Sequence, residues 1–230
     1  RDVRLKYMFV EMQKDPGTKL KLASNYASVA NYWKFYDGET KQLLKYDVFG
    51  QKQKVEADFM KWAKEKPDYA AIFPEWEKTY TAWRPYAKHR VYMNEGIFGS
   101  PLIAFAASLL QLEAAILKPN STKEDVKKAM AASIEARKGF LESHDAVSDQ
   151  NILGAVLMMY YKDVPKEQHP ISYFETVKGS YGDLKDEATW KKYAASVFAN
   201  TMVLNEEKWN AFAANPDGVK LQEDPAFFIA

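Results

Sequence analysis

The residues most often used for hydrolytic or metal chemistry occur here in unsuitable combinations. The three histidines are His89, His144 and His169, and none has a glutamate three residues before it, as the di-iron site of a helical bundle requires. The patterns His-Glu-x-x-His, Gly-x-Ser-x-Gly and Gly-x-x-x-x-Gly-Lys are missing as well. We therefore predict no catalytic residue, no metal site and no cofactor in this chain.

Two short stretches have the residue types of a serine hydrolase. Gly99-Ser100-Pro101 resembles the end of a nucleophile loop, but a turn followed by a proline-initiated helix explains it better. Ser143-His144-Asp145 are adjacent in sequence, so their side chains point in different directions and cannot relay a proton. We interpret Asp145 as the cap of the following helix.

The stretch from Leu22 to Trp33 is the more informative one, because it contains no formal charge in a chain that is 27% charged. Apolar residues recur in it at helical spacing, which predicts a helix with one core face. That face comprises Leu22, Tyr26, Val29, Trp33 and Tyr36. The opposite face comprises Ser24, Ala27, Ser28, Asn31 and Phe35. A solvent-facing surface would be rich in Lys and Glu, so a small, uncharged face predicts close approach by another helix, another domain or a ligand.

Asn31 is the candidate binding residue on this second face. At about 100° per residue, it lies almost opposite the Tyr26/Val29/Trp33 stripe. Its amide could hydrogen-bond a neighbouring helix or cap a backbone group. Alternatively, it could face a cleft and bind an amine or carbonyl of a ligand, since it has two donors and an acceptor oxygen. The pattern alone favours the hydrogen bond within the protein, because buried polar groups usually bond protein partners.

Helical periodicity dominates the rest of the chain, and no β-type alternation persists. The sequence predicts an all-α fold, a single layered multi-helix bundle. Expected helices span about 2–14, 18–46 (kinked or broken near Asp37-Gly38), 51–66, 74–85, 86–98, 102–117, 123–142, 145–161, 171–178, 187–204 and 206–214. The segment 102–117 is apolar on most sides and is expected to be the central helix. We expect a turn at Phe49-Gly50 and a capping box at Thr122 and Asp125.

Bulk composition narrows the possible partners. The chain has 230 residues, 47% of them hydrophobic, and its 32 basic and 31 acidic residues are mixed along it for a net charge of +1. This argues against nucleic acid or an anionic membrane as the main partner. There is no cysteine, no apolar run of membrane-spanning length and no visible signal peptide. The chain begins within an amphipathic pattern and stops on Phe227-Phe228-Ile229, so we expect it to be a piece excised from a longer protein.

The block Tyr26-Ala-Ser-Val-Ala-Asn-Tyr-Trp-Lys34 resembles a signature of the helical domain of bacterial dipeptidyl-peptidases 7 and 11. Weaker agreement extends over most of the chain, from Glu11-Met-x-x-Asp15-Pro16 through Glu56-x-x-Phe59-x-x-Trp62 to Asp163-Val-Pro165.

The resemblance implies an architecture. Members of this family are serine peptidases with a chymotrypsin-like double β-barrel, into which a helical domain is inserted as a cap over the active-site cleft. The catalytic His, Asp and Ser belong to the barrel, and the family's Gly-Asn-Ser-Gly-Ser-Pro loop is missing here. Residues 1–230 would then be a single helical cap domain, not catalytic alone.

The resemblance also implies a function. The parent enzyme would release dipeptides from the amino end of oligopeptides, form a homodimer and be periplasmic, cell-surface or secreted. Asn31 matches the family's asparagine that helps to hold the substrate's α-amino group. The partners would be the catalytic β-barrel domain of the same parent chain and an oligopeptide substrate, with neither nucleic acid nor membrane. The alternative is a free-standing helical binding or scaffolding domain without a catalytic role.

Overall fold

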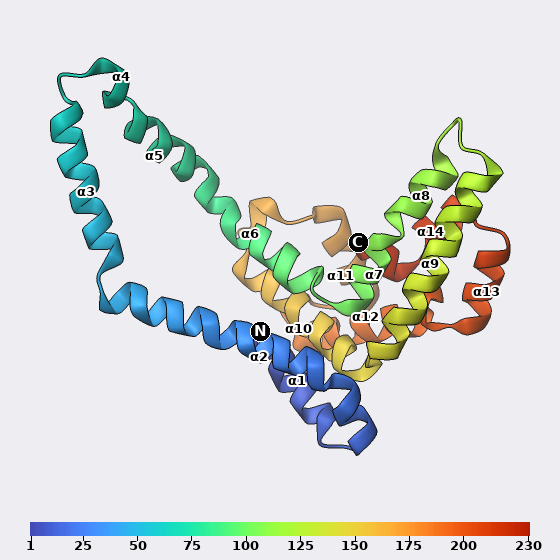
Figure 1. Cartoon of the computed structure of the whole chain (residues 1–230). Coiled ribbons are helices and arrows are strands. Elements are labelled where there is room, and N and C mark those ends of the chain that lie inside the picture. Colours follow the sequence, from blue (N-terminus) through green and yellow to red (C-terminus); the bar gives the residue numbers. More distant parts are fainter.

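The computed structural model describes residues 1–230 and contains helices but no strands, which confirms the all-α prediction. Its helices form a multi-helix bundle from which two helical arms project and meet at a distant tip (Figure 1). The prediction of one layered bundle is therefore wrong for the arms. No single helix is long and apolar enough to cross a membrane; the segments Pro67–Ile97 and Pro101–Leu117 reach that length and composition only together, and they are bent by 94°.

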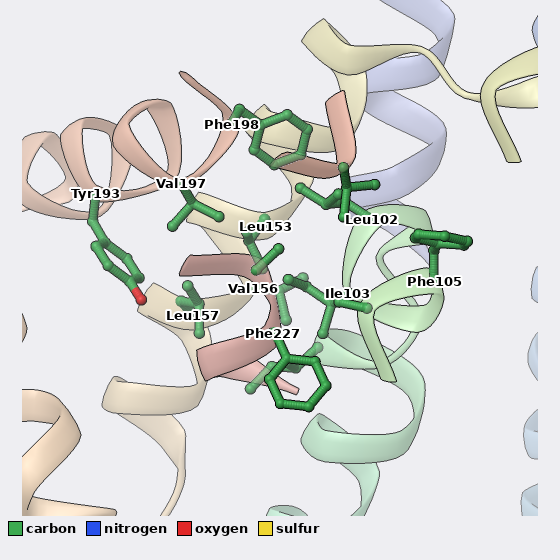
Figure 2. Packing of buried hydrophobic residues seen from close by; sticks show 14 of the residues in the cluster. Leu102, Ile103, Phe105, Leu153, Val156, Leu157, Tyr193, Val197, Phe198 and Phe227 are labelled. Atoms are coloured by element: carbon green, nitrogen blue, oxygen red, sulfur yellow. The ribbon is translucent and has the colours of Figure 1, made fainter. Parts of the chain in front are cut away.

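The bundle is built around α10 (Ala146–Asp163) and α12 (Glu187–Asn200), which pack against each other. The side chains that α10 contributes to the core, Ile152, Leu153, Val156, Leu157 and Tyr160, are all buried. Figure 2 shows Leu102 and Ile103 among the buried side chains of this region. The other bundle elements are α1 (Asp2–Met12), η2 (Tyr92–Ile97, a π-helix), α7 (Pro101–Ser108), α8 (Leu110–Leu117), α9 (Lys123–Ser143), η3 (Lys166–Gln168), α11 (Ile171–Tyr181), η4 (Met202–Leu204), α13 (Glu206–Ala214), α14 (Gly218–Gln222) and α15 (Pro225–Ile229).

Local signals at the ends of the helices are confirmed. Thr122 and Asp125 form a reciprocal capping box at the start of α9. The Asp145 side chain accepts a hydrogen bond from the Ser148 amide, and Asn205 likewise caps α13. Phe227 packs into the core through α15 and is buried, whereas Phe228 beside it is exposed.

The expected central helix 102–117 is divided. α7 and α8 are separated at Leu109, whose amide bonds Ala106 rather than continuing the α-helical ladder. α7 is buried in the core, but α8 projects beside α9 and leaves Leu110 and Leu117 exposed. Only the first half of the predicted helix is therefore central, because the second half packs mainly against α9 and α14.

The first arm begins as α2 (Pro16–Lys45), an unbroken helix of 30 residues. The predicted kink near Asp37-Gly38 is wrong, because one glycine costs a helix only about 1 kcal/mol relative to alanine. A Lys41–Asp37 ion pair also spans the site. The turn comes at Asp47, in a left-handed conformation with φ of 45°, so the expected turn at Phe49-Gly50 lies inside the next helix.

The arms continue through α3 (Val48–Ala63), α4 (Pro67–Ala70), α5 (Ile72–Trp83), η1 (Arg84–Tyr86) and α6 (Ala87–Val91). Between Tyr32 and Val91, Ala63 is the only buried residue. The same segment holds 17 of the 27 large hydrophobic side chains that are exposed. The arms have no core of their own, so their apolar surface is available to something outside this chain.

Candidate functional site

Asn31 lies on α2 at the point where this helix leaves the bundle. Nine residues earlier, Leu22 is only 2% exposed, and Tyr26 and Val29 pack against the core. Asn31 is about 180° around the helix from Leu22. Its side chain is exposed and makes no hydrogen bond within the chain. A hydrogen bond from Asn31 to a neighbouring helix, the structural interpretation of this residue, is therefore not formed in this chain.

The predicted core face of α2 is only half correct. Trp33 is 38% exposed and Tyr36 is 48% exposed, although both continue the stripe that begins at Leu22. The reason is length: α1 has 11 residues and α2 has 30, so α2 extends beyond the helices that cover its first turns. Trp33 therefore does not anchor the helix in the bundle; it lies exposed on the side of α2 that faces away from Asn31.

Arg1 joins the bases of the two arms by contacting Tyr36 on one and Glu95 on the other. The Arg1 guanidinium lies 4.6 Å from the ring centroid of Tyr36 on α2, within cation–π range. The same group donates a hydrogen bond of 2.7 Å to the Glu95 carboxylate in η2. Glu95 is thus an exposed ion-pair partner of Arg1.

The contact between α1 and the π-helix η2 depends on Gly99. Arg4 on α1 donates to the Glu95 carbonyl over 2.9 Å. A Cβ at Gly99 would lie 1.6 Å from Arg4 Nη2 and 2.4 Å from the Glu95 carbonyl oxygen. Gly99 is therefore needed for close approach between α1 and the π-helix, and this approach fixes the root of the second arm.

Ser100, which follows Gly99, is buried and donates a 2.7 Å hydrogen bond to the Asp149 carboxylate. The other oxygen of Asp149 accepts from the Leu102 amide over 2.9 Å. Asp149 thus caps α7 from a distant helix, and Ser100 is held as its donor. This agrees with the prediction of a turn and a proline-initiated helix, and it gives Ser100 no character of a nucleophile.

His144 and Asp149 are the buried titratable groups of the bundle. Nδ1 of His144 is 3.6 Å from Asp149, beyond hydrogen-bond distance, and neither ring nitrogen has a hydrogen-bond partner. Burial lowers the pKa of His144 to about 4. Burial raises the pKa of Asp149 to about 6, against the opposing hydrogen bonds from Ser100 and Leu102. The sequence did contain a signal for Asp149, since it is a charged residue three positions before Ile152 on a buried helix face.

No group of three or more His, Asp or Glu side chains is arranged to hold a metal ion. The candidate binding group on the first arm is the exposed amide of Asn31, and aromatic side chains are exposed on the same arm.

The family model described as Peptidase S46 matches residues 1–230. The chain belongs to the peptidase S46 family. An Asp/Glu-specific dipeptidyl-peptidase of Flavobacterium psychrophilum is 30% identical over 216 residues, covering 92% of this S46 chain and 28% of the relative. Dipeptidyl-peptidase 7 of Porphyromonas gingivalis is 28% identical over 224 residues, with coverages of 94% and 29%. An Asp/Glu-specific dipeptidyl-peptidase of Capnocytophaga gingivalis is 33% identical over 171 residues, with coverages of 72% and 24%.

The resemblance to dipeptidyl-peptidases 7 and 11 is thereby confirmed at the level of the family. The S46 chain spans less than a third of the length of these relatives. More than two thirds of each relative thus has no counterpart in the residues described here.

Proposed function

We propose that this S46 chain is the helical cap domain of a dipeptidyl-peptidase, and that Asn31 helps to bind the α-amino group of an oligopeptide substrate. The observation that carries the proposal is the position of Asn31. It is exposed, it has no hydrogen-bond partner in the chain, and it lies opposite the stripe that attaches α2 to the bundle. A polar group presented in this way is free to bind a ligand.

The chemistry of an α-ammonium suits an amide. The ammonium has three N–H donors and needs acceptors, and the Asn31 side-chain oxygen is one. A carboxylate from the remainder of the longer protein would supply a second acceptor and the opposite charge. Fixing the amino end at a set distance from the nucleophile would place the peptide bond after the second residue at that nucleophile, so that the enzyme releases dipeptides.

The shape of the chain supports a cap. The arms extend well beyond the bundle and expose aromatic side chains that nothing in the chain covers. In this proposal the side of α2 that bears Asn31 faces a catalytic β-barrel domain of the same parent chain. The proposal includes a periplasmic or cell-surface location, which fractionation of the source cells tests. Membership of a peptidase family favours it over the alternative of a free-standing scaffold.

The test replaces Asn31 in the longer protein and measures kcat/KM for release of a dipeptide from a chromogenic substrate. Hydrogen bonds to charged groups contribute about 1.5–3 kcal/mol, so Asn31→Ala should lower kcat/KM about 10-fold or more. Asn25→Ala is the matched control, because Asn25 is exposed on the same helix about 120° away and also makes no side-chain hydrogen bond.

Two readouts separate a binding role from a folding defect. Thermal unfolding of Asn31→Ala should match the parent or improve on it, because alanine favours an exposed helical position. Residual cleavage of a substrate with an acetylated amino end, which lacks the ammonium, should be the same for Asn31→Ala and the parent. An unchanged kcat/KM for the free-amine substrate would overturn the role of Asn31.

A further inference from the structure

A groove between α9 and α13 is a second candidate binding site, and Asn31 is not among its lining residues (Figure 1). Its volume is about 470 Å³, within the range of small-molecule pockets. Ile134, Leu141 and Ala213 give it an apolar wall, and charged side chains of both signs complete much of the lining. The groove therefore suits a ligand that has apolar and charged groups together.

Arg137 is the unusual residue of this groove, because it is charged and yet only 6% exposed. Its Nε donates to the Val203 carbonyl over 2.8 Å, and its Nη1 donates to the Glu206 carboxylate over 2.9 Å. The guanidinium also lies 5.1 Å from the ring centroid of Trp209. These contacts hold it in one orientation, so little rotamer freedom is lost when it binds a ligand.

Two donors in the groove have no acceptor within the chain. Nη2 of Arg137 forms no hydrogen bond, although it is not sealed from solvent. The same holds for Nε1 of Trp209, a residue that is only 2% exposed. By contrast, Nε1 of Trp190 in the same bundle donates to the Leu184 carbonyl. Nearly buried donors without acceptors favour an anion, and a carboxylate offers two acceptor oxygens.

The acidic side chains of the groove discriminate between classes of anion. Glu142 and Glu206 both line it, and their negative charges repel a multiply charged group such as phosphate. Glu142 forms no ion pair within the chain, so its carboxylate can accept from a cation. A ligand with one carboxylate and one ammonium satisfies both signs of charge.

The spacing of the charges along α9 matches a short peptide. Glu142 follows Arg137 by five residues, which is about 7.5 Å along the helix axis. An extended dipeptide spans about 7 Å, so its carboxylate can lie at Arg137 while its ammonium lies near Glu142. A single amino acid is too short to reach both charges. In a longer peptide that binds through its carboxylate, the ammonium lies beyond Glu142.

We infer that this groove binds a free dipeptide, with the carboxylate on Arg137 and Trp209 and the ammonium on Glu142. The inference does not rest on the proposed cap function, because Asn31 takes no part in it and its tests measure binding alone. A dipeptide is also what the proposed enzyme releases, so the groove would be a product-binding site of that enzyme.

The first experiment titrates the ¹⁵N-labelled 230-residue chain with the dipeptide Leu-Leu and follows the indole N–H signals by NMR. We expect the Trp209 signal, identified by its loss in Trp209→Phe, to shift in a saturable way. Leu-Leu amide lacks the carboxylate and should bind at least about 10-fold more weakly. Acetyl-Leu-Leu lacks the ammonium and Gly-Gly-Leu-Leu displaces it, so each should bind several-fold more weakly than Leu-Leu.

Variants of the groove test the same assignment without removing the hydrogen bonds of Arg137. Glu142→Gln should weaken the binding of Leu-Leu several-fold and leave that of acetyl-Leu-Leu unchanged, because only Leu-Leu has an ammonium. Ala213→Phe should abolish binding, since its ring fills the groove from α13. The matched control is Glu135→Gln, two turns earlier on the same side of α9 and outside the groove, which should bind Leu-Leu like the parent. Thermal unfolding checks that each variant is folded.

Four results would each overturn the inference. The first is a Trp209 signal that stays unchanged up to the solubility limit of Leu-Leu. The second is equal affinity for Leu-Leu and its amide, and the third is a Glu142→Gln variant that binds Leu-Leu like the parent. The fourth is equal affinity for Leu-Leu and Gly-Gly-Leu-Leu, because the groove would then take the carboxyl end of a longer chain rather than a free dipeptide.

Discussion

Nδ1 of His144 lies 3.6 Å from the carboxylate of Asp149, and both side chains are almost completely buried. Burial shifts the pKa values of the two groups in opposite directions, because desolvation disfavours the charged form of each group. The pKa of Asp149 rises to about 6, with Arg4 nearby opposing the rise and Asp145 adding to it. The pKa of His144 falls to about 4, and Lys21 adds to the fall.

These shifts predict two opposing contributions to the pH dependence of stability. Unfolded Asp and His have pKa values of about 3.9 and 6.5. Between about pH 4 and pH 6 the folded chain keeps a proton on Asp149 that the unfolded chain loses, so this group stabilises the fold more as the pH falls. Over the same interval the unfolded chain holds a proton on His144 that the folded chain lacks, so this group stabilises the fold less as the pH falls.

Replacing either residue of the pair should leave only the pH dependence of stability that the other residue causes. For His144→Leu, the free energy of unfolding relative to the parent should rise by about 2 kcal/mol between pH 6.5 and pH 4.5, given about 1.4 kcal/mol per pKa unit. For Asp149→Asn it should change in the opposite direction. Urea unfolding at a series of pH values measures both. Parallel profiles for the two variants would show that the pair does not set the pH dependence.

Ser100 and Asp149 show what the sequence could not predict. They lie 49 residues apart, and a tertiary contact between polar groups leaves no periodic pattern. The caps at Thr122, Asp145 and Asn205 could be predicted because donor and acceptor lie within one turn of each other. The apolar stripe on α2 could be predicted as well. The residue at which neighbouring helices cease to cover that stripe could not. Leu22 and Trp33 have the same periodicity, and only the length of the neighbouring helices distinguishes them.

Mutations can show where along α2 the packing against the bundle ends. Leu22→Ala should destabilise the chain by about 2–5 kcal/mol, because it removes a fully buried side chain from the core. Trp33→Ala should cost about 1 kcal/mol or less, although tryptophan is the larger residue, because much of its surface is already exposed. Chemical denaturation of both variants of the 230-residue chain tests this order. A larger loss for Trp33→Ala would mean that α2 is covered along its whole length.

Replacing Gly99 or Gly38 by alanine should change the stability of the chain in opposite directions. At Gly99 the added methyl group would meet Arg4 and the Glu95 carbonyl, so Gly99→Ala should destabilise the chain by about 1–3 kcal/mol. At Gly38 a Cβ meets nothing within 4 Å, and Gly38→Ala should stabilise the helix by about 0.5–1 kcal/mol. Thermal unfolding measures both changes.

The contact with Arg4 can be separated from the contact with the backbone. The double variant Gly99→Ala/Arg4→Ala should recover only part of the loss relative to Arg4→Ala alone, because the Glu95 carbonyl still blocks the site. Full recovery would show that the arginine, rather than the π-helical backbone, requires glycine at position 99.

Hydrogen exchange should distinguish the arms from the bundle. Between Tyr32 and Val91 only Ala63 is buried, so the backbone hydrogen bonds of α3 and α5 have little tertiary packing to protect them. In the dilute 230-residue chain, their amides should exchange by local opening, whereas α10 and α12 should exchange close to the rate of global unfolding. Equal protection of α5 and α10 in the dilute chain would mean that the arms are stabilised by contacts within a single copy.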